Sequence, residues 1–156
     1  MELLIDALLE WISAETGRDI AGLTRPTVVE MSPEELTGEY YADYPYLAPE
    51  DGRDERLQAL YASTDGASGT IYILAAETVE DAEHFDAPHE NPVWREILLH
   101  ELVHHIQWQS GEADNWQCQS FGEREAYMLG GRYLDRTRTR DPLPNRRFWA
   151  HVYARC

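Results

Sequence analysis

Three histidines and a glutamate interrupt a mostly apolar stretch of the chain, which runs from Ile97 to Gln107 and reads ILLHELVHHIQ. Residues four apart in an α-helix lie one above the other on the same face. A helix here therefore presents the imidazoles of His100 and His104 to a single point. Burying such polar groups among apolar neighbours is costly unless they have a partner. The segment predicts a buried helix that holds a metal ion.

The spacing HExxH indicates which ion is bound and which role each residue has. Two imidazole nitrogens one helical turn apart match the ligand set of Zn²⁺, which takes nitrogen ligands at about 2.0–2.1 Å. Glu101 lies about 100° further round the helix, so its carboxylate reaches a zinc-bound water without ligating the metal. We therefore predict that His100 and His104 are zinc ligands and that Glu101 is the general base.

This segment resembles the active-site helix of the zincin metallopeptidases. The longer zincin pattern with a third histidine is absent, because Gln107 and Ser110 stand where a glycine and a histidine are required. The segment Ser120–Tyr127, which reads SFGEREAY, instead resembles the glutamate helix of the gluzincins. The resemblance covers roughly residues 70–134 and extends to the small minimal gluzincins of bacteria, many of them uncharacterised. It implies a zincin-like fold and a third zinc ligand from a glutamate.

Two glutamates compete for the place of the third ligand. Glu123 shares a mostly apolar helical face with Ala126 and Tyr127, and it stands three residues before the alanine, as the ligand does in several gluzincins. Tyr127 replaces the aspartate that follows in those proteins. Against this choice, Ser120 and Glu123 also have the spacing of a helix capping box. Glu123 is the favoured ligand, and Glu125, on a more polar face, remains the alternative.

Other residues near the motif are candidates for supporting roles. Gln107 lies on the metal-facing side of the helix and either orients a ligand or satisfies a buried backbone group. His105 points away from the metal and is expected to be structural. His84 and His89, in an acidic segment, are expected to be exposed. Four residues are candidates to stabilise the oxyanion of a hydrolytic reaction: Tyr127, His151, Tyr153 and Arg147.

The rest of the pattern predicts an α+β fold of the zincin type in a single domain, residues 1–156. We expect a small sheet covered on one side by the active-site helix and the glutamate helix. The strand Thr70–Leu74 is either an edge strand that pairs with substrate or an ordinary core strand. The expected elements are a helix 2–16 ended by Gly17, a strand 27–31, a short helix capped by Ser32, a loop 40–54, a hairpin of 57–62 with 70–74, a solvated loop 77–91, a helix 92–111, a helix 120–134 and an aromatic segment 148–153.

Composition limits the partners. The formal net charge is −16 and there is no lysine, so nucleic acid is not an expected partner. Eight of the 13 arginines follow residue 122, where they either pair with the protein's own carboxylates or attract an anion. No apolar run approaches the roughly 20 residues that span a membrane, and no signal peptide is recognised, so we expect a cytoplasmic protein. Cys118 and Cys156 form one disulfide or remain free thiols.

These patterns predict a zinc-dependent metallopeptidase, a hydrolase that cleaves peptide bonds in a peptide or protein substrate with a water activated by Glu101. The alternative is a zincin-like module that binds zinc in a regulatory or binding role without useful catalysis. A third reading is a helical protein that carries the motif by chance. The acidic charge favours basic peptides over acidic ones. Neither the cleavage specificity nor the oligomeric state follows from the sequence.

Overall fold

The computed structural model describes residues 1–156 and shows an α+β protein with five α-helices and one mixed sheet of three strands. Short 3₁₀ turns connect several of these elements. In chain order the helices and strands are α1 (Glu2–Thr16), β1 (Thr27–Met31), α2 (Pro33–Tyr40), β2 (Ala59–Ala62), β3 (Thr70–Leu74), α3 (Pro92–Gln109), α4 (Glu123–Thr137) and α5 (Arg146–Tyr153).

The strands lie in the order β1-β3-β2. β3 runs parallel to β1, with Thr70 beside Thr27, and antiparallel to β2, with Thr70 beside Ala62. The predicted hairpin is therefore confirmed, although β2 begins at Ala59 rather than at Leu57. Of the two alternatives for β3, the edge strand is wrong and the core strand is confirmed, because strands occupy both of its sides. The free edge nearest to α3 belongs to β2.

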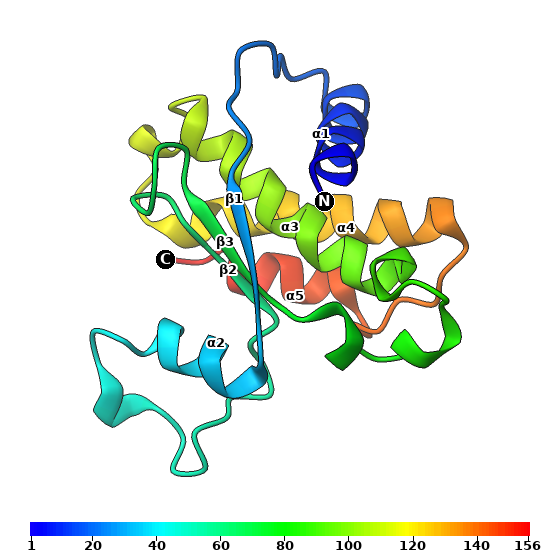
Figure 1. Ribbon diagram of the computed structural model, residues 1–156. Coiled ribbons are helices and arrows are strands. Elements are labelled where there is room, and N and C mark those ends of the chain that lie inside the picture. The colour runs from blue at the N-terminus through cyan, green and yellow to red at the C-terminus, as the bar shows by residue number, and fades with distance from the viewer.

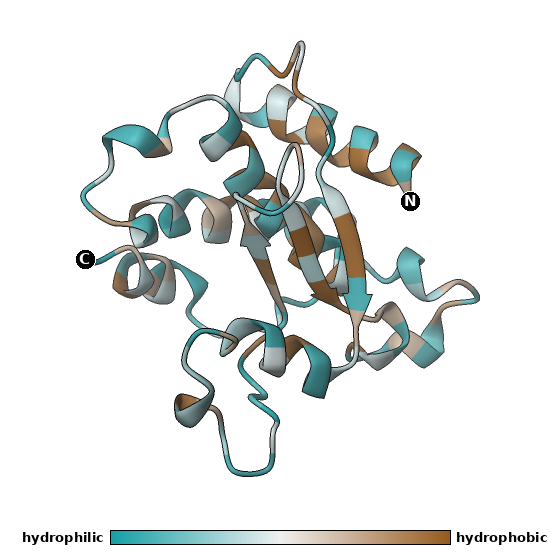
Figure 2. Ribbon diagram, turned by 60° about the vertical axis from the view of Figure 1, so that its left-hand side comes forward, coloured by the Kyte–Doolittle hydropathy of each residue, from teal (hydrophilic) through white to brown (hydrophobic).

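The core lies between the sheet and α3, with α1 packed against the same helix (Figure 1). α3 is buried over most of its length, as the apolar sequence around the motif predicts. The indole Nε1 of Trp94 donates a hydrogen bond of 2.8 Å to the carbonyl of Leu74, which joins the start of α3 to the end of β3. Figure 2 shows that β3 and β1 and the inner face of α1 are rich in apolar residues.

Of the two helices that were predicted to cover the sheet, only α3 does so. α3 contacts β2 and β3, whereas α4 packs mainly against α3 and α5 and lies behind α3 in Figure 1. The apolar side chains of α4, such as Leu129 and Leu134, are buried in this helical layer. The predicted layer of two helices is therefore a stack, in which α3 separates the sheet from α4. The face of α3 that carries His100 and His104 therefore meets α4 rather than a strand.

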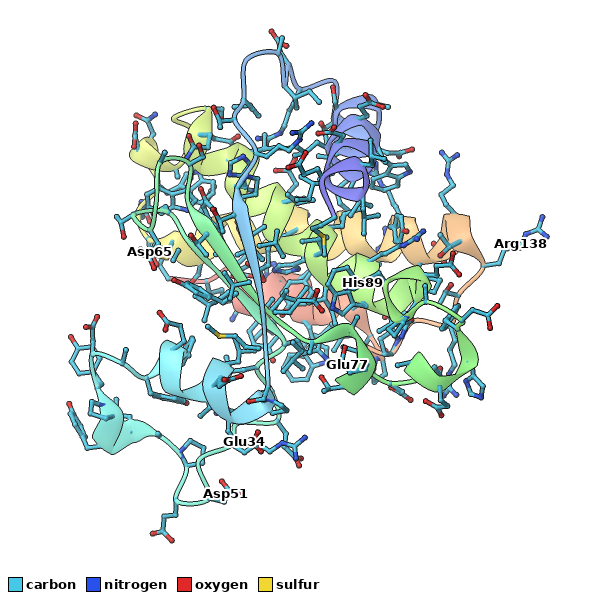
Figure 3. The ribbon with its side chains drawn as sticks, in the orientation of Figure 1. Glu34, Asp51, Asp65, Glu77, His89 and Arg138 are labelled. Carbon is cyan, nitrogen blue, oxygen red and sulfur yellow. A yellow bond between two sulfur atoms is a disulfide. The ribbon has the colours of Figure 1, made fainter.

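The predicted helix ends are confirmed at two places. Gly17 ends α1 in the left-handed conformation (φ 73°). Ser32 caps α2 in a complete capping box with Glu35. α2 and the loop after it project from the body of the molecule, where Glu34 and Asp51 face outward (Figure 3).

Segment 77–91 is less solvated than its acidic composition suggests. It forms short 3₁₀ turns, and Val79 and Ala82 point into the interior. A few apolar side chains at turn positions are enough to hold this acidic segment against the core.

The C-terminal aromatic segment forms α5, which packs against α4. A disulfide joins Cys156, three residues after the end of α5, to Cys118 in the segment before α4. Of the two predicted states of the cysteines, the disulfide is therefore the one observed. Part of the arginine-rich end pairs with carboxylates of the protein itself: Arg136 contacts Glu15, and Arg146 contacts Glu96 and Asp141. None of the helices is long and apolar enough to cross a membrane.

Candidate metal centre

His100 and His104 of α3 meet Glu123, the first residue of α4. The Nε2 atoms of the two histidines are 3.2 Å apart. Nε2 of His100 lies 3.1 Å from Oε2 of Glu123, and Nε2 of His104 lies 3.5 Å from Oε1 of the same carboxylate. One nitrogen or oxygen from each of the three residues therefore converges on one small volume, with ligand atoms all within 4.8 Å of one another.

The spacing of these atoms fits a tetrahedral ion. Ligands about 2.0–2.1 Å from a tetrahedral Zn²⁺ are separated from each other by about 3.3 Å. The two imidazole nitrogens are 3.2 Å apart, close to that value, and they lie 3.1 and 3.5 Å from the two different oxygens of the Glu123 carboxylate. Two imidazole nitrogens and a carboxylate oxygen are also the donor types that zinc takes in catalytic sites, where a fourth position stays open. The residues present therefore suit zinc.

The start of α4 determines which glutamate reaches the histidines. A 3₁₀ turn at Gln119–Gly122 precedes the helix, and Gly122 occupies the N-cap without a side-chain hydrogen bond. The alternative capping box of Ser120 with Glu123 is therefore not formed, and the Glu123 carboxylate is free to face α3. Glu125 does not join the histidines, because its carboxylate binds Arg18 at 2.6 Å and Gln107 at 3.0 Å.

Glu101 lies beside the two histidines and is 8% exposed. Burial raises the pKa of its carboxyl group, and the nearby His100 and His104 partly oppose that rise. The side chain makes no hydrogen bond that would hold it elsewhere in the structure. It is thus free to contact a water molecule beside the two histidines, and its role as a general base remains a prediction.

The charges of His104 and Glu123 are coupled. Burial by itself lowers the pKa of His104, but the hydrogen bond that its imidazole donates to Glu123 and the charges of Glu101 and Glu123 outweigh burial and raise that pKa to about 9. Burial also acts on Glu123, yet its bonds to both histidines hold the pKa of this carboxyl group well below its usual range. The carboxylate of Glu123 thus favours the protonated form of the His104 imidazole.

Gln107 contacts a metal-facing histidine directly. Its Oε1 atom lies 2.9 Å from Nδ1 of His104, and the side chain is fully enclosed. Its Nε2 atom donates a hydrogen bond of 3.2 Å to the carbonyl of Gly122. A Cβ atom on Gly122 would lie 2.5 Å from Oε1 of Gln107, so only glycine lets the start of α4 approach this closely. Gln107 therefore has the supporting position that its spacing suggests.

Among the four oxyanion candidates, Tyr127 lies next to the metal centre. Its ring meets that of His100 edge to face, with centroids 4.7 Å apart. Burial raises the pKa of its phenol, and the charges of Glu123 and Glu101 raise it further. Tyr153 stacks on the other side of Tyr127 with centroids 5.5 Å apart.

The remaining two candidates lie on the surface of α5. His151 is exposed and lies 3.1 Å from Arg155, and Arg147 is exposed as well. Neither has a contact with the three residues that converge on α3 and α4. Of the four candidates, Tyr127 is thus the one whose ring contacts a histidine of the site.

A buried ion pair between Arg146 and Glu96, close to the site, was not predicted from the sequence. Arg146, 8% exposed, crosses from α5 to reach Glu96 on α3, with Nη1 of Arg146 2.7 Å from Oε1 of Glu96. Glu96 stands one helical turn before His100. The arginine passes over Gly130 and Gly131 of α4, where a side chain would overlap the ion pair. The adjacent glycines inside a helix are the sequence signal that indicates such a close crossing.

The other histidines lie outside the metal centre. His105 is fully buried, and its Nδ1 atom is 3.3 Å from the hydroxyl of Tyr61 on β2, so the expectation of a structural role fits its position. His84 and His89 are both away from α4, with side chains 67% and 43% exposed. His89 binds Glu30 at 2.7 Å and contacts Trp94.

Comparison with known proteins places the chain in one family. Neither the curated proteins nor the solved structures contain a match to it. A family model described as "Domain of unknown function (DUF6647)" matches residues 1–155, nearly the whole sequence, and the chain therefore belongs to the DUF6647 family.

Proposed function

We propose that the protein is a zinc-dependent hydrolase of peptide bonds. The observation that carries the proposal is the convergence of His100, His104 and Glu123, at separations that suit a tetrahedral ion, with the buried carboxylate of Glu101 beside them. The first two residues belong to α3 and the third to α4. Neither helix holds the complete set. The packing of α4 on α3 brings in the third potential ligand, which a chance occurrence of HExxH would lack.

Each residue has a specific role in the proposed reaction. Zinc held by His100, His104 and Glu123 would supply a water of lowered pKa, near 7, and would polarise the scissile carbonyl. The carboxylate of Glu101 accepts the proton of the attacking water and delivers it to the nitrogen of the leaving amine. The phenol of Tyr127 donates a hydrogen bond to the oxyanion that forms on the substrate carbonyl.

The free edge of β2 is the proposed binding place for the peptide backbone. β2 is the edge strand that packs against α3, and its far side has no strand beside it. An extended peptide adds to such an edge through main-chain hydrogen bonds. Tyr61 anchors this strand to α3, since its ring meets that of His105 edge to face, with centroids 5.6 Å apart. This strand takes the role that the sequence suggested for β3.

The test compares the wild type with Glu101→Gln, which preserves shape and removes the base. We expect about one zinc ion per chain in both proteins by elemental analysis, and cleavage of a mixed peptide library by the wild type only. A chelator should stop the cleavage and added zinc should restore it. Equal turnover by Glu101→Gln would contradict the assigned base. Zinc in both proteins with no cleavage in either would instead support the alternative, a zinc-binding module without catalysis.

A further inference from the structure

The amide of Gln107 can take only one orientation in this structure. Its Nε2 atom faces two groups that only accept hydrogen bonds, the carbonyl of Gly122 at 3.2 Å and Oε2 of Glu125 at 3.0 Å. A flipped amide would point its oxygen at both acceptors and lose both bonds. The oxygen Oε1 is therefore left to face Nδ1 of His104 at 2.9 Å.

This orientation has a consequence for His104. An amide oxygen only accepts hydrogen bonds, so Nδ1 of His104 must carry a proton to bond with it. In a neutral imidazole the other nitrogen, Nε2, then has its lone pair free. That nitrogen lies 3.2 Å from Nε2 of His100 and 3.5 Å from Glu123, and it is the atom that has to bind the metal.

Glu125 is itself held in place by charge. Nη2 of Arg18 lies 2.6 Å from the carboxylate of Glu125, and Nη1 of the same arginine lies 2.5 Å from that of Glu112. The Glu125 side chain is 33% exposed, whereas Gln107 is almost completely enclosed. A hydrogen-bonded chain therefore runs from the surface pair through the buried amide to the histidine. Arg18 follows α1, so the chain joins the N-terminal part of the protein to the metal centre.

We propose that Glu125 is a positioning residue, which sets the orientation of the Gln107 amide and thereby directs Nε2 of His104 toward the metal. The inference rests on the metal centre of the proposed function and does not depend on catalysis. Glu125 therefore has a role at the site without being a ligand. Outer partners of this kind change metal affinity by about 10- to 100-fold when they are removed.

A double-mutant cycle on zinc affinity tests this role. We expect Glu125→Met and Gln107→Leu each to raise the zinc Kd by about tenfold or more. If Glu125 acts through Gln107, the double variant will bind zinc no more weakly than Gln107→Leu alone. Losses that multiply in the double variant would show that Glu125 acts by another route and would overturn the proposal. Glu112→Met is the matched control, because Glu112 pairs with the same arginine but does not contact Gln107; its Kd should remain that of the wild type.

The tautomer of His104 gives a readout that a purely structural role would not change. Long-range ¹H–¹⁵N spectra of the metal-free protein, recorded at a pH high enough for the His104 imidazole to be neutral, should show the proton on Nδ1 in the wild type. Glu125→Met should shift it partly to Nε2, and Glu125→Gln, which keeps an acceptor oxygen, should restore the wild-type pattern. An unchanged tautomer in Glu125→Met would overturn the proposal. These spectra need neither zinc nor a substrate. Their result therefore tests the role of Glu125 independently of whether the protein cleaves peptides.

Discussion

Glu123 and Glu125 lie two residues apart in the first turn of α4 and meet different partners. Two residues correspond to about 200° of rotation round a helix, so the two carboxylates leave the helix on nearly opposite sides. Glu123 faces the histidines of α3, and Glu125 faces Gln107 and Arg18. Because they leave the helix on nearly opposite sides, one glutamate is a ligand candidate and the other is a partner of the buried Gln107 amide.

At the residue scale, Tyr127→Phe tests the proposed oxyanion donor. The variant keeps the ring that packs against His100 and Tyr153 but removes the hydroxyl. We expect kcat to fall by about 100-fold, while the zinc content and the KM change little, since the lost hydrogen bond forms only with the oxyanion. Steady-state kinetics on a cleaved peptide measures this. A kcat within a factor of two of the wild type would remove Tyr127 from the mechanism.

A second prediction at this scale concerns the glycine under the buried ion pair. A Cβ atom at Gly130 would overlap the Glu96 carboxylate and would lie 3.0 Å from Nη1 of Arg146. Gly130→Ala should therefore lower the free energy of unfolding by about 1–3 kcal/mol, despite the better helix propensity of alanine. Chemical unfolding followed by circular dichroism measures the change.

Gly38→Ala in α2 is the matched control for this substitution. A Cβ atom there meets nothing within 4 Å, so alanine should be neutral or raise the stability by about 0.5–1 kcal/mol. A Gly130→Ala variant as stable as this control would show that the ion pair moves aside without cost.

At the element scale, α5 is attached at both of its ends. Arg146, its first residue, is bonded to Glu96 and to Asp141. Beyond its last residue, the disulfide joins Cys156 to Cys118, five residues before Glu123. Between these attachments Trp149 stacks on Tyr153, and Tyr153 stacks on Tyr127. α5 thus supports the tyrosine that touches a metal-facing histidine.

Removal of the disulfide should loosen this helix. The bridge closes a loop across a sequence separation of 38 residues, and Cys118→Ser with Cys156→Ser should cost roughly 2–4 kcal/mol of stability. We expect hydrogen exchange in α5 to become faster than in α3, because the arginine then holds only one end. Mass spectrometry of exchanged peptides measures both helices in one experiment. Equal protection of α5 in the two proteins would show that the packing on α4 alone holds it.

At the scale of the whole molecule, the charge is strongly negative and distributed around the surface. The net charge is −16, and exposed acidic residues such as Asp51 and Glu77 lie in different parts of the molecule (Figure 3). Arg138 also points outward, at the end of α4. A surface of this kind attracts cationic ligands over distances of about one Debye length.

The charge predicts a preference among peptide substrates. Arg/Lys-rich peptides should be cleaved with a higher kcat/KM than Asp/Glu-rich peptides of the same length at low ionic strength. The difference should shrink when the salt is raised from about 10 mM to several hundred mM, since screening acts on encounter rates. Competition between the two peptide sets in one reaction measures the ratio. A ratio that does not depend on salt would assign the selectivity to local contacts instead.

Much of the fold follows from local patterns in the sequence. The ends of α1 and α2, the strand β1 and the long helix α3 are predicted from caps, glycines and apolar periodicity, which act within a few residues of chain. The position of β3 in the middle of the sheet is not predicted, because strand order depends on contacts between segments some forty residues apart. The helical form of residues 148–153 also depends on packing, since Tyr153 stacks on Tyr127 of α4.

The sequence by itself determined the two histidines, the glutamate between them and their placement on one buried helix, because a spacing of four residues and the helical repeat suffice for that. The tertiary structure decided which carboxylate of α4 joins them, which tyrosine lies beside them and what orients the Gln107 amide. The physical reason is distance along the chain: Glu123, Arg18 and Arg146 reach the site only through the packing of separate helices, and no local pattern records how a helix will be rotated when it packs.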